Sequence, residues 1–176
     1  MIGRLTVSKG IREYYEAVKI VRSKYPEVKC CLAGEYEVQN IDCIDNELYG
    51  NLVMGNVVTY LGFRKDTASL IGNSSVVVLP SYREGTPRAL LEALAVGRAV
   101  ITTDTPGCRE VINPDLHHRN GFLIAPGNTQ NLALCMENII SNPTIIAEMG
   151  ANGRKYAEEK FDVRNVNKEM LATLEL

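Results

Sequence analysis

Short apolar runs alternate with longer amphipathic stretches along most of the chain. Most of the apolar runs are nearly continuous, as in strands that are buried on both faces of a parallel sheet. Strands are therefore predicted over residues 1–5, 28–33, 57–61, 75–79, 99–102 and 121–124. Helical spacing predicts helices over residues 10–24, 41–54, 67–72 and 87–96. This alternation indicates βα units, a parallel sheet and a three-layer, Rossmann-like α/β fold.

The pattern changes at Thr129, beyond which apolar residues repeat only at helical spacing. Pro143 restarts a helix there, and Phe161 leads into a last helical stretch that runs to Leu176. The sequence has 176 residues, of which 45% are hydrophobic, and this is enough for one well-buried core. Residues 1–176 are therefore expected to form a single domain.

Charge and cysteine content narrow the classes of function. A formal net charge of -2 gives no overall attraction to nucleic acid or to anionic lipid, so any anion site must be local. No charged segment followed by an apolar run and no long apolar stretch is found, so the chain as it stands is expected to be cytoplasmic. The five cysteines lack CxxC spacing, and the adjacent His117 and His118 lack clustered partners. Reduced thiols and no metal site are therefore expected.

In an open parallel sheet, ligands bind outside the carboxyl ends of the strands. The loop after the first predicted strand carries Arg4 and Lys9, and the loop after the second carries Gly34. Phe63 and Arg64 follow the third strand, whereas "PSYREGTPR" and "TDTPGCRE" follow the fourth and fifth. Loops are commonly polar and glycine-containing, which explains any one of them. The whole set on one edge favours a ligand site.

The stretch "EGTPRALLEA" predicts a helix start with Thr86 as the N-cap and Pro87 at the first helical position. The N–H groups of Arg88 and Ala89 would then be free to bind phosphate oxygens at the positive end of the helix dipole. Alternatively, the Thr86 hydroxyl caps those groups itself, and the helix start is only structural.

Glu92 lies among the leucines of this predicted helix, and its side chain should lean back toward the helix start. A carboxylate there suits the two hydroxyls of a ribose, and the alternative is a weak ion pair with Arg88. Glu84 lies outside the helix beside Gly85, where a sugar beyond the phosphates would fall. Arg4 and Lys9 would supply positive charge to a diphosphate leaving group without a metal ion.

Four stretches, "GRLTVSKG", "YLGF", "VVLPSYREGTPRALLEALAVGRAVITTDTPGCREVI" and "NGFLIAPGN", resemble the donor-binding domain of retaining glycosyltransferases of family 4, the group 1 type. This domain is the C-terminal half of the GT-B fold. Glu84 and Glu92 match the E-x7-E motif of that family. The residues of these motifs are most similar to those of bacterial transferases that build capsule, O-antigen or other lipid-linked glycans.

The resemblance implies that Arg4 and Lys9 bind the donor diphosphate, that Glu92 takes the ribose hydroxyls and that Glu84 contacts the donor sugar. The backbone of Gly85, Thr86, Pro87, Arg88 and Ala89 would meet the phosphates and the sugar, and Gly34, Phe63 and Arg64 would frame the base.

The reaction implied is sugar transfer from a nucleotide diphosphate sugar, with UDP as the expected nucleotide and no metal or other cofactor, to an acceptor hydroxyl with retention. A lipid-linked glycan acceptor would bind an N-terminal domain that this chain does not include, and the whole protein would lie at the inner face of the membrane. The isolated chain is expected to be inactive. Two alternatives stay open: a fragment like nucleotide-sugar 2-epimerases, and a catalytically silent nucleotide-sugar-binding module.

Overall fold

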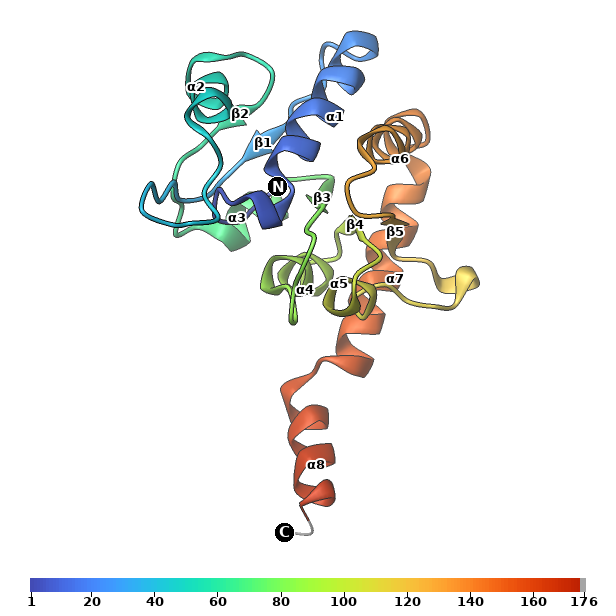
Figure 1. Ribbon diagram of the computed structural model, residues 1–176. Coiled ribbons are helices and arrows are strands. Elements are labelled where there is room, and N and C mark those ends of the chain that lie inside the picture. The colour runs from blue at the N-terminus through green and yellow to red at the C-terminus, as the bar shows by residue number, and fades with distance from the viewer. Residues whose placement is uncertain (175–176) are drawn as a thin grey trace.

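A computed structural model describes residues 1–174 and shows strands and helices in alternation (Figure 1). The strands are β1 (Cys31–Leu32), β2 (Thr59–Tyr60), β3 (Val76–Leu79), β4 (Ala99–Thr103) and β5 (Gly121–Ile124). The α-helices are α1 (Ile11–Lys24), α2 (Asn46–Met54), α3 (Thr67–Gly72), α4 (Arg88–Ala95), α5 (Pro106–Arg109), α6 (Thr129–Ser141), α7 (Thr144–Lys160) and α8 (Val163–Thr173). Two short 3-10 helices, η1 and η2, span Val7–Lys9 and Leu116–His118.

All the strand pairs are parallel, and they fall into two groups. Strands β3, β4 and β5 form one sheet in that order, in which Val78 pairs with Ile101 and Ile101 with Phe122. Strands β1 and β2 form a separate pair, with Cys31 opposite Thr59. Parallel strands flanked by helices confirm the predicted Rossmann-like α/β fold.

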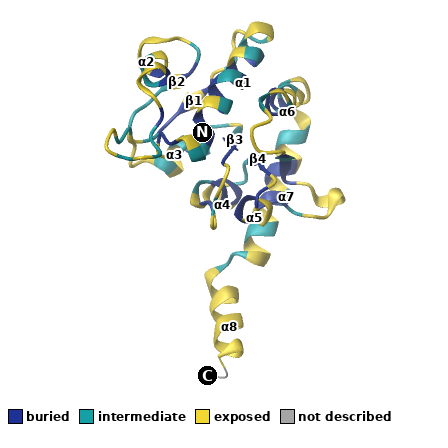
Figure 2. Ribbon diagram, in the orientation of Figure 1, coloured by how far each residue is buried: buried dark blue, intermediate teal, exposed yellow. Residues whose placement is uncertain are grey.

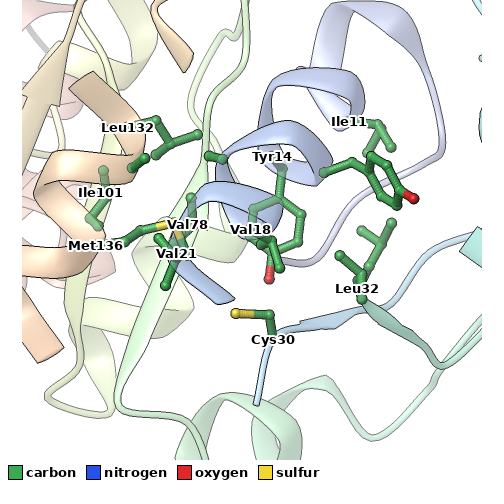
Figure 3. Packing of buried hydrophobic residues seen from close by; sticks show 14 of the residues in the cluster. Ile11, Tyr14, Val18, Val21, Cys30, Leu32, Val78, Ile101, Leu132 and Met136 are labelled. Carbon is green, nitrogen blue, oxygen red and sulfur yellow. The ribbon is translucent and has the colours of Figure 1, made fainter. Parts of the chain in front are cut away.

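Helices cover both faces of the central sheet, because alternate residues of β3 and β4 point into different cores. Val78 and Ile101 pack with α1 and α6 in the larger core, where Figure 3 shows Tyr14 and Val18 between strand residues on either side. Val77 and Val100 point the opposite way and pack with α3 and α4. The helix α8 leads away from both cores and buries none of its residues (Figure 2).

Several element boundaries differ from the prediction. Only Ile2 of the predicted first strand forms an assigned bridge, to Ala33. The second helix begins at Asn46 rather than at residue 41, because the Asp45 side chain accepts from the Leu48 N–H and caps it. The last helix ends at Thr173, and the predicted end at residue 176 lies outside the described residues.

The structure also confirms two predicted features of the helices. The helix α3 has the predicted bounds, and α6 ends just before Pro143, after which α7 begins. All five cysteines are free thiols. Within residues 1–174, none of the helices has both the length and the apolar character needed to cross a membrane.

Candidate functional site

The loops at the carboxyl ends of the strands are held against one another through backbone contacts. The Tyr82 N–H, just after β3, donates to the Ser8 carbonyl at 2.8 Å. Gly10 has a φ of 70°, and a Cβ there would overlap the Pro80 carbonyl oxygen. Only glycine satisfies both demands without strain. The segment that carries Lys9 is therefore packed directly on the loop that carries Glu84.

Lys9 and Glu84 form an ion pair at this contact. The Lys9 Nζ lies 2.5 Å from the Glu84 Oε1, and the Ser81 hydroxyl donates to the same oxygen at 2.7 Å. The Lys9 side chain is 23% exposed and the Glu84 side chain only 9%. Sequence analysis placed both residues at one ligand site, and the structure brings them into direct contact. Both are well shielded from solvent, so we expect the pair to couple more strongly than a surface ion pair does.

Two threonines of β4 donate hydrogen bonds to the backbone at the start of the loop that carries Glu84. The Thr102 hydroxyl donates to the Leu79 carbonyl at 2.8 Å, and the Thr103 hydroxyl donates to the Ser81 carbonyl. Thr102, Thr103 and Ser81 are all fully buried. Their hydrogen bonds hold Ser81, and through it the Glu84 carboxylate, in a defined position.

Gly107 supports the next part of the loop. This residue lies in α5, and a Cβ there would overlap the carbonyl oxygens of both Gly85 and Glu84. The first turn of α5 thus approaches the loop as closely as a backbone can. In the sequence, Gly107 is visible only as part of the stretch "TDTPGCRE", because its partners Glu84 and Gly85 are distant in the chain.

The helix α4 begins one residue later than predicted. Pro87, not Thr86, is the N-cap, and no side chain caps the helix. The prediction that Thr86 caps the helix is therefore wrong, because the extended Pro87 with ψ 102° delays the first helical turn to Arg88. Within the described part of the chain, the N–H groups of Arg88 and Ala89 have no intramolecular acceptor. Two amides without an acceptor therefore lie at the helix start, where Arg88 is exposed and Ala89 is half-buried.

Glu92 lies on the exposed side of α4, whereas Leu90 and Leu94 face the core. The helix therefore buries an apolar stripe and leaves the carboxylate in solvent. No ion pair joins Glu92 to Arg88 among residues 1–174, so the structural alternative that the sequence left open for Glu92 is not realised. The Glu92 carboxylate is available to a ligand.

The other predicted residues line a separate small cavity of about 170 Å³ at the same edge of the strands. Its lining includes Arg4, Gly34, Phe63 and Arg64, as expected for residues that frame one group of a ligand. The Arg4 side chain is exposed and lies 3.8 Å from the Glu37 carboxylate. No contact joins Arg4 to Lys9 in the described chain, so the two predicted diphosphate ligands start from different positions.

The walls of this cavity are fixed by polar contacts. The Tyr60 hydroxyl donates to the Gly34 carbonyl at 2.9 Å. The Arg64 guanidinium donates to both oxygens of Asp66 at 2.8 and 2.7 Å, and this hydrogen bonding lowers the pKa of the Asp66 carboxyl. Arg64 is thus already paired, whereas Phe63 is exposed and free to pack on a flat ring.

Two residues near the Lys9–Glu84 pair were missed by sequence analysis. Ser81 is one, because its burial two residues after the end of β3 is not visible in the sequence. Tyr82 is the other: its hydroxyl donates to the Glu13 carboxylate at 2.7 Å, which raises the pKa of Tyr82 to about 12.

Among the residues described, no three His, Cys, Asp or Glu side chains cluster where they would hold a metal ion.

Comparisons by sequence relate the chain to known proteins. Residues 1–156 match the model of the family "Glycosyl transferases group 1". The capsular polysaccharide biosynthesis glycosyltransferase CapM from Staphylococcus aureus is 31% identical over 169 residues, which are 96% of this chain and 43% of CapM. An N,N'-diacetylbacillosaminyl-diphospho-undecaprenol alpha-1,3-N-acetylgalactosaminyltransferase from Campylobacter jejuni is 37% identical over 113 residues, which are 64% of this chain and 28% of that protein.

Comparison of structures agrees with these matches. The crystal structure of HepE from Anabaena in complex with UDP has a TM-score of 0.85 and 28% identity, over 99% of this chain and 48% of HepE. This chain thus spans less than half the length of CapM and of HepE. Since the family model matches most of the sequence and the fold agrees, the chain belongs to the group 1 glycosyl transferases and has the fold of the C-terminal half of a GT-B enzyme.

Proposed function

We propose that this chain is the donor-binding half of a retaining glycosyltransferase that moves a sugar from a nucleotide diphosphate sugar to an acceptor hydroxyl. The observation that carries the proposal is the shielded Lys9–Glu84 pair, because Glu84 lies only four residues before Arg88, the first of the two free amides at the start of α4. UDP is the proposed nucleotide, because HepE, whose fold is similar over almost the whole chain, was solved with UDP and with UDP-glucose.

In the proposed complex, the diphosphate lies at the start of α4. The free N–H groups of Arg88 and Ala89 and the positive end of the helix dipole face it. Lys9 and Arg4 add positive charge beside these amides, and such charge stabilises the leaving diphosphate as its bond to the sugar breaks. These groups would supply the charge without a metal ion.

Two carboxylates are proposed to bind the ribose and the sugar of the donor. Glu92, exposed one turn inside α4 and unpaired with Arg88, accepts the two ribose hydroxyls. Glu84 contacts the donor sugar while Ser81 and Lys9 hold its Oε1, which leaves Oε2 for a sugar hydroxyl. A carboxylate whose Oε1 is held by two neighbours presents Oε2 in a fixed position as a sugar ligand, and front-face attack by the acceptor retains the configuration.

The acceptor is proposed to be a lipid-linked glycan that meets an N-terminal domain outside this chain. The Campylobacter relative supports this, because its name gives a diphospho-undecaprenol-linked sugar as its substrate. CapM, in turn, is named for capsular polysaccharide biosynthesis. The full protein would then work from the cytoplasm at the inner face of the membrane, and these 176 residues would bind donor without transferring sugar.

Calorimetric titration of UDP and 2′-deoxy-UDP tests the donor site. Glu92→Gln should weaken UDP binding about 10- to 100-fold, the effect of losing charged hydrogen bonds of ~1.5–3 kcal/mol. The same variant should lose less affinity for 2′-deoxy-UDP than for UDP, because 2′-deoxy-UDP lacks one of the two hydroxyls that Glu92 accepts. Glu148→Gln is the matched control, since Glu148 is exposed on α7. Equal loss for both nucleotides, or loss in the control, contradicts the assignment of Glu92.

A further inference from the structure

The short helix η1, which carries Lys9 into the candidate site, is held by a residue far away in the chain. Among the described residues, no hydrogen bond from the Thr6 side chain caps η1 at its N-cap position. Instead, the Asp42 carbonyl accepts from the Val7 N–H at 2.8 Å, and both Asp42 carboxylate oxygens accept from the Ser8 N–H at 3.3 Å. The Ser8 hydroxyl donates to the same carboxylate. Asp42 thus caps η1 from 34 residues away.

Ser8 joins this cap to the loop that carries Glu84. Its carbonyl accepts from the Tyr82 N–H at 2.8 Å, two residues before Glu84. The N–H and hydroxyl of Ser8 are therefore bound to one segment and its carbonyl to another. Since Lys9 is the next residue, the position of Ser8 also determines where the lysine meets the Glu84 Oε1. Hydrogen bonds thus connect Asp42, through Ser8, to both members of the ion pair.

Asp42 is itself fixed in place. Its N–H donates to the Asn40 side-chain oxygen at 2.9 Å, and the residue is half-buried. Two residues further on, the Ile44 N–H donates to the Leu5 carbonyl at 3.1 Å. The segment around Asp42 is therefore bound to the first residues of the chain on both sides of the carboxylate, which gives Ser8 a rigid partner.

The loop that carries Asp42 also reaches the smaller cavity. Its first residues, Gly34 and Glu35, line that cavity. The Glu37 carboxylate lies 3.8 Å from Arg4, which lines the cavity as well. One loop therefore touches both places where the donor is proposed to bind, and Asp42 is its contact at the end near the ion pair.

We propose that Asp42 is a positioning residue of the donor site, which holds Ser8 and thereby sets the geometry of the Lys9–Glu84 pair for the diphosphate and the sugar. The inference rests on the proposed function, since it concerns what orders the residues of that site. Asp42 does not touch the donor. Its effect is that Lys9 and Glu84 are ordered before the donor arrives, which lowers the entropy cost of binding. Binding of the phosphate and sugar end therefore depends on Asp42, whereas binding of the base and ribose does not.

Amide hydrogen exchange of the unliganded chain tests the connection through Ser8. Asp42→Ala should speed exchange of the Tyr82 amide about 10-fold or more, because the Ser8 carbonyl that accepts from it is no longer held. Asp115→Ala is the matched control, since the Asp115 side chain accepts from the His117 N–H and caps the other 3-10 helix, η2. The control should leave the Tyr82 amide unchanged. If Asp42→Ala also leaves it unchanged, Asp42 only caps η1 and the proposal is overturned.

Calorimetric titration of UMP and UDP-glucose into the same variants tests the effect on the donor. Asp42→Ala should weaken UDP-glucose binding about 5- to 100-fold and UMP binding less than about 2-fold, because UMP lacks the second phosphate and the sugar. Ser8→Ala removes only the hydroxyl and should weaken UDP-glucose binding about 2- to 10-fold. This variant carries the same test if Asp42→Ala does not fold. Equal losses for the two ligands would contradict the positioning role, since they would indicate a loosened fold.

The titrations separate this inference from the proposed function. If the unmodified chain binds neither UMP nor UDP-glucose, the proposed function fails, and the positioning role fails with it. If the unmodified chain binds both ligands and Asp42→Ala changes neither affinity, the proposed function stands and only the role of Asp42 is wrong.

Discussion

The Lys9–Glu84 pair should be strongly coupled in free energy, and a double-mutant cycle measures that coupling. Lys9→Met keeps the apolar stem and removes the charge, and Glu84→Gln keeps the shape and removes the opposite charge. Exposed ion pairs couple by ~0.2–1 kcal/mol, whereas breaking a fully buried pair costs ~3–5 kcal/mol. With Lys9 23% and Glu84 9% exposed, the pair lies between these limits. The expected coupling is about 1–3 kcal/mol.

The single variants should be unequal. Lys9→Met leaves the Glu84 carboxylate with only the Ser81 hydroxyl, 2.7 Å away, so it should lower the free energy of unfolding by about 2–3 kcal/mol. Glu84→Gln keeps an oxygen that accepts from both neighbours, and it should cost less.

Urea unfolding followed by circular dichroism measures each corner of the cycle. A loss of ~2 kcal/mol moves the midpoint by about 1 M at a typical slope. Lys19→Met with Glu16→Gln is the matched control, because that pair is exposed on both sides. Coupling below about 0.5 kcal/mol for Lys9 and Glu84, or equal coupling in the two pairs, would refute the claim that burial strengthens the contact.

Two further predictions concern backbone packing and pH. Gly107→Ala should lower the free energy of unfolding by about 2–4 kcal/mol and weaken UDP binding, because its Cβ would displace Gly85. As the control, Gly50→Ala has no atom near its Cβ and should instead stabilise α2 by ~0.5–1 kcal/mol. The Met1 amine, lowered by burial to a pKa of about 6 from 8.0, should make stability fall by ~1–2 kcal/mol as pH drops from 8 to 6, since the unfolded chain takes up the proton first. Thermal melts across this range, repeated after N-terminal acetylation, test the latter, and an unchanged pH profile would count against it.

The sequence predicted the layers well because both cores are built from regular patterns. Nearly continuous apolar runs such as Val76–Leu79 and Ala99–Thr103 are buried from both sides, and such runs admit few other structures. Boundaries were less predictable where two signals compete. Thr86–Pro87 looked like a cap and a first helical residue, but the ψ of 102° at Pro87 postponed the helix.

The first strand shows a different limit of sequence analysis. Residues 1–5 have a strand pattern, and their N–H groups do make ladder bonds to β1, yet only Ile2 counts as a bridge. A strand is defined by its hydrogen bonds to a neighbouring strand, so its length depends on the neighbours on both sides. Met1 and Gly3 make their ladder bonds to the carbonyls of Cys31 and Ala33. Local pattern alone does not report how many neighbours a strand has.

The candidate site was predictable as a set of loops but not as a set of contacts. All its residues follow strand ends, and the parallel sheet brings those ends to one edge. The sequence does not show that Lys9 reaches Glu84, because that contact depends on Gly10 packing on Pro80, seventy residues away. Nor does it separate Arg4, which lines the smaller cavity instead.

This distribution of charge bears on how a donor would be held. Lys9 is engaged with Glu84, and Arg4 lies near Glu37, so neither cation is a free phosphate ligand in the unliganded chain. The amides of Arg88 and Ala89, by contrast, have no acceptor among the residues described. A diphosphate would therefore meet the helix start first, while Lys9 stays on the Glu84 Oε1 and adds its charge from there. The same lysine would then face the phosphates and hold Glu84 in place for the sugar, which couples recognition of the two ends of the donor.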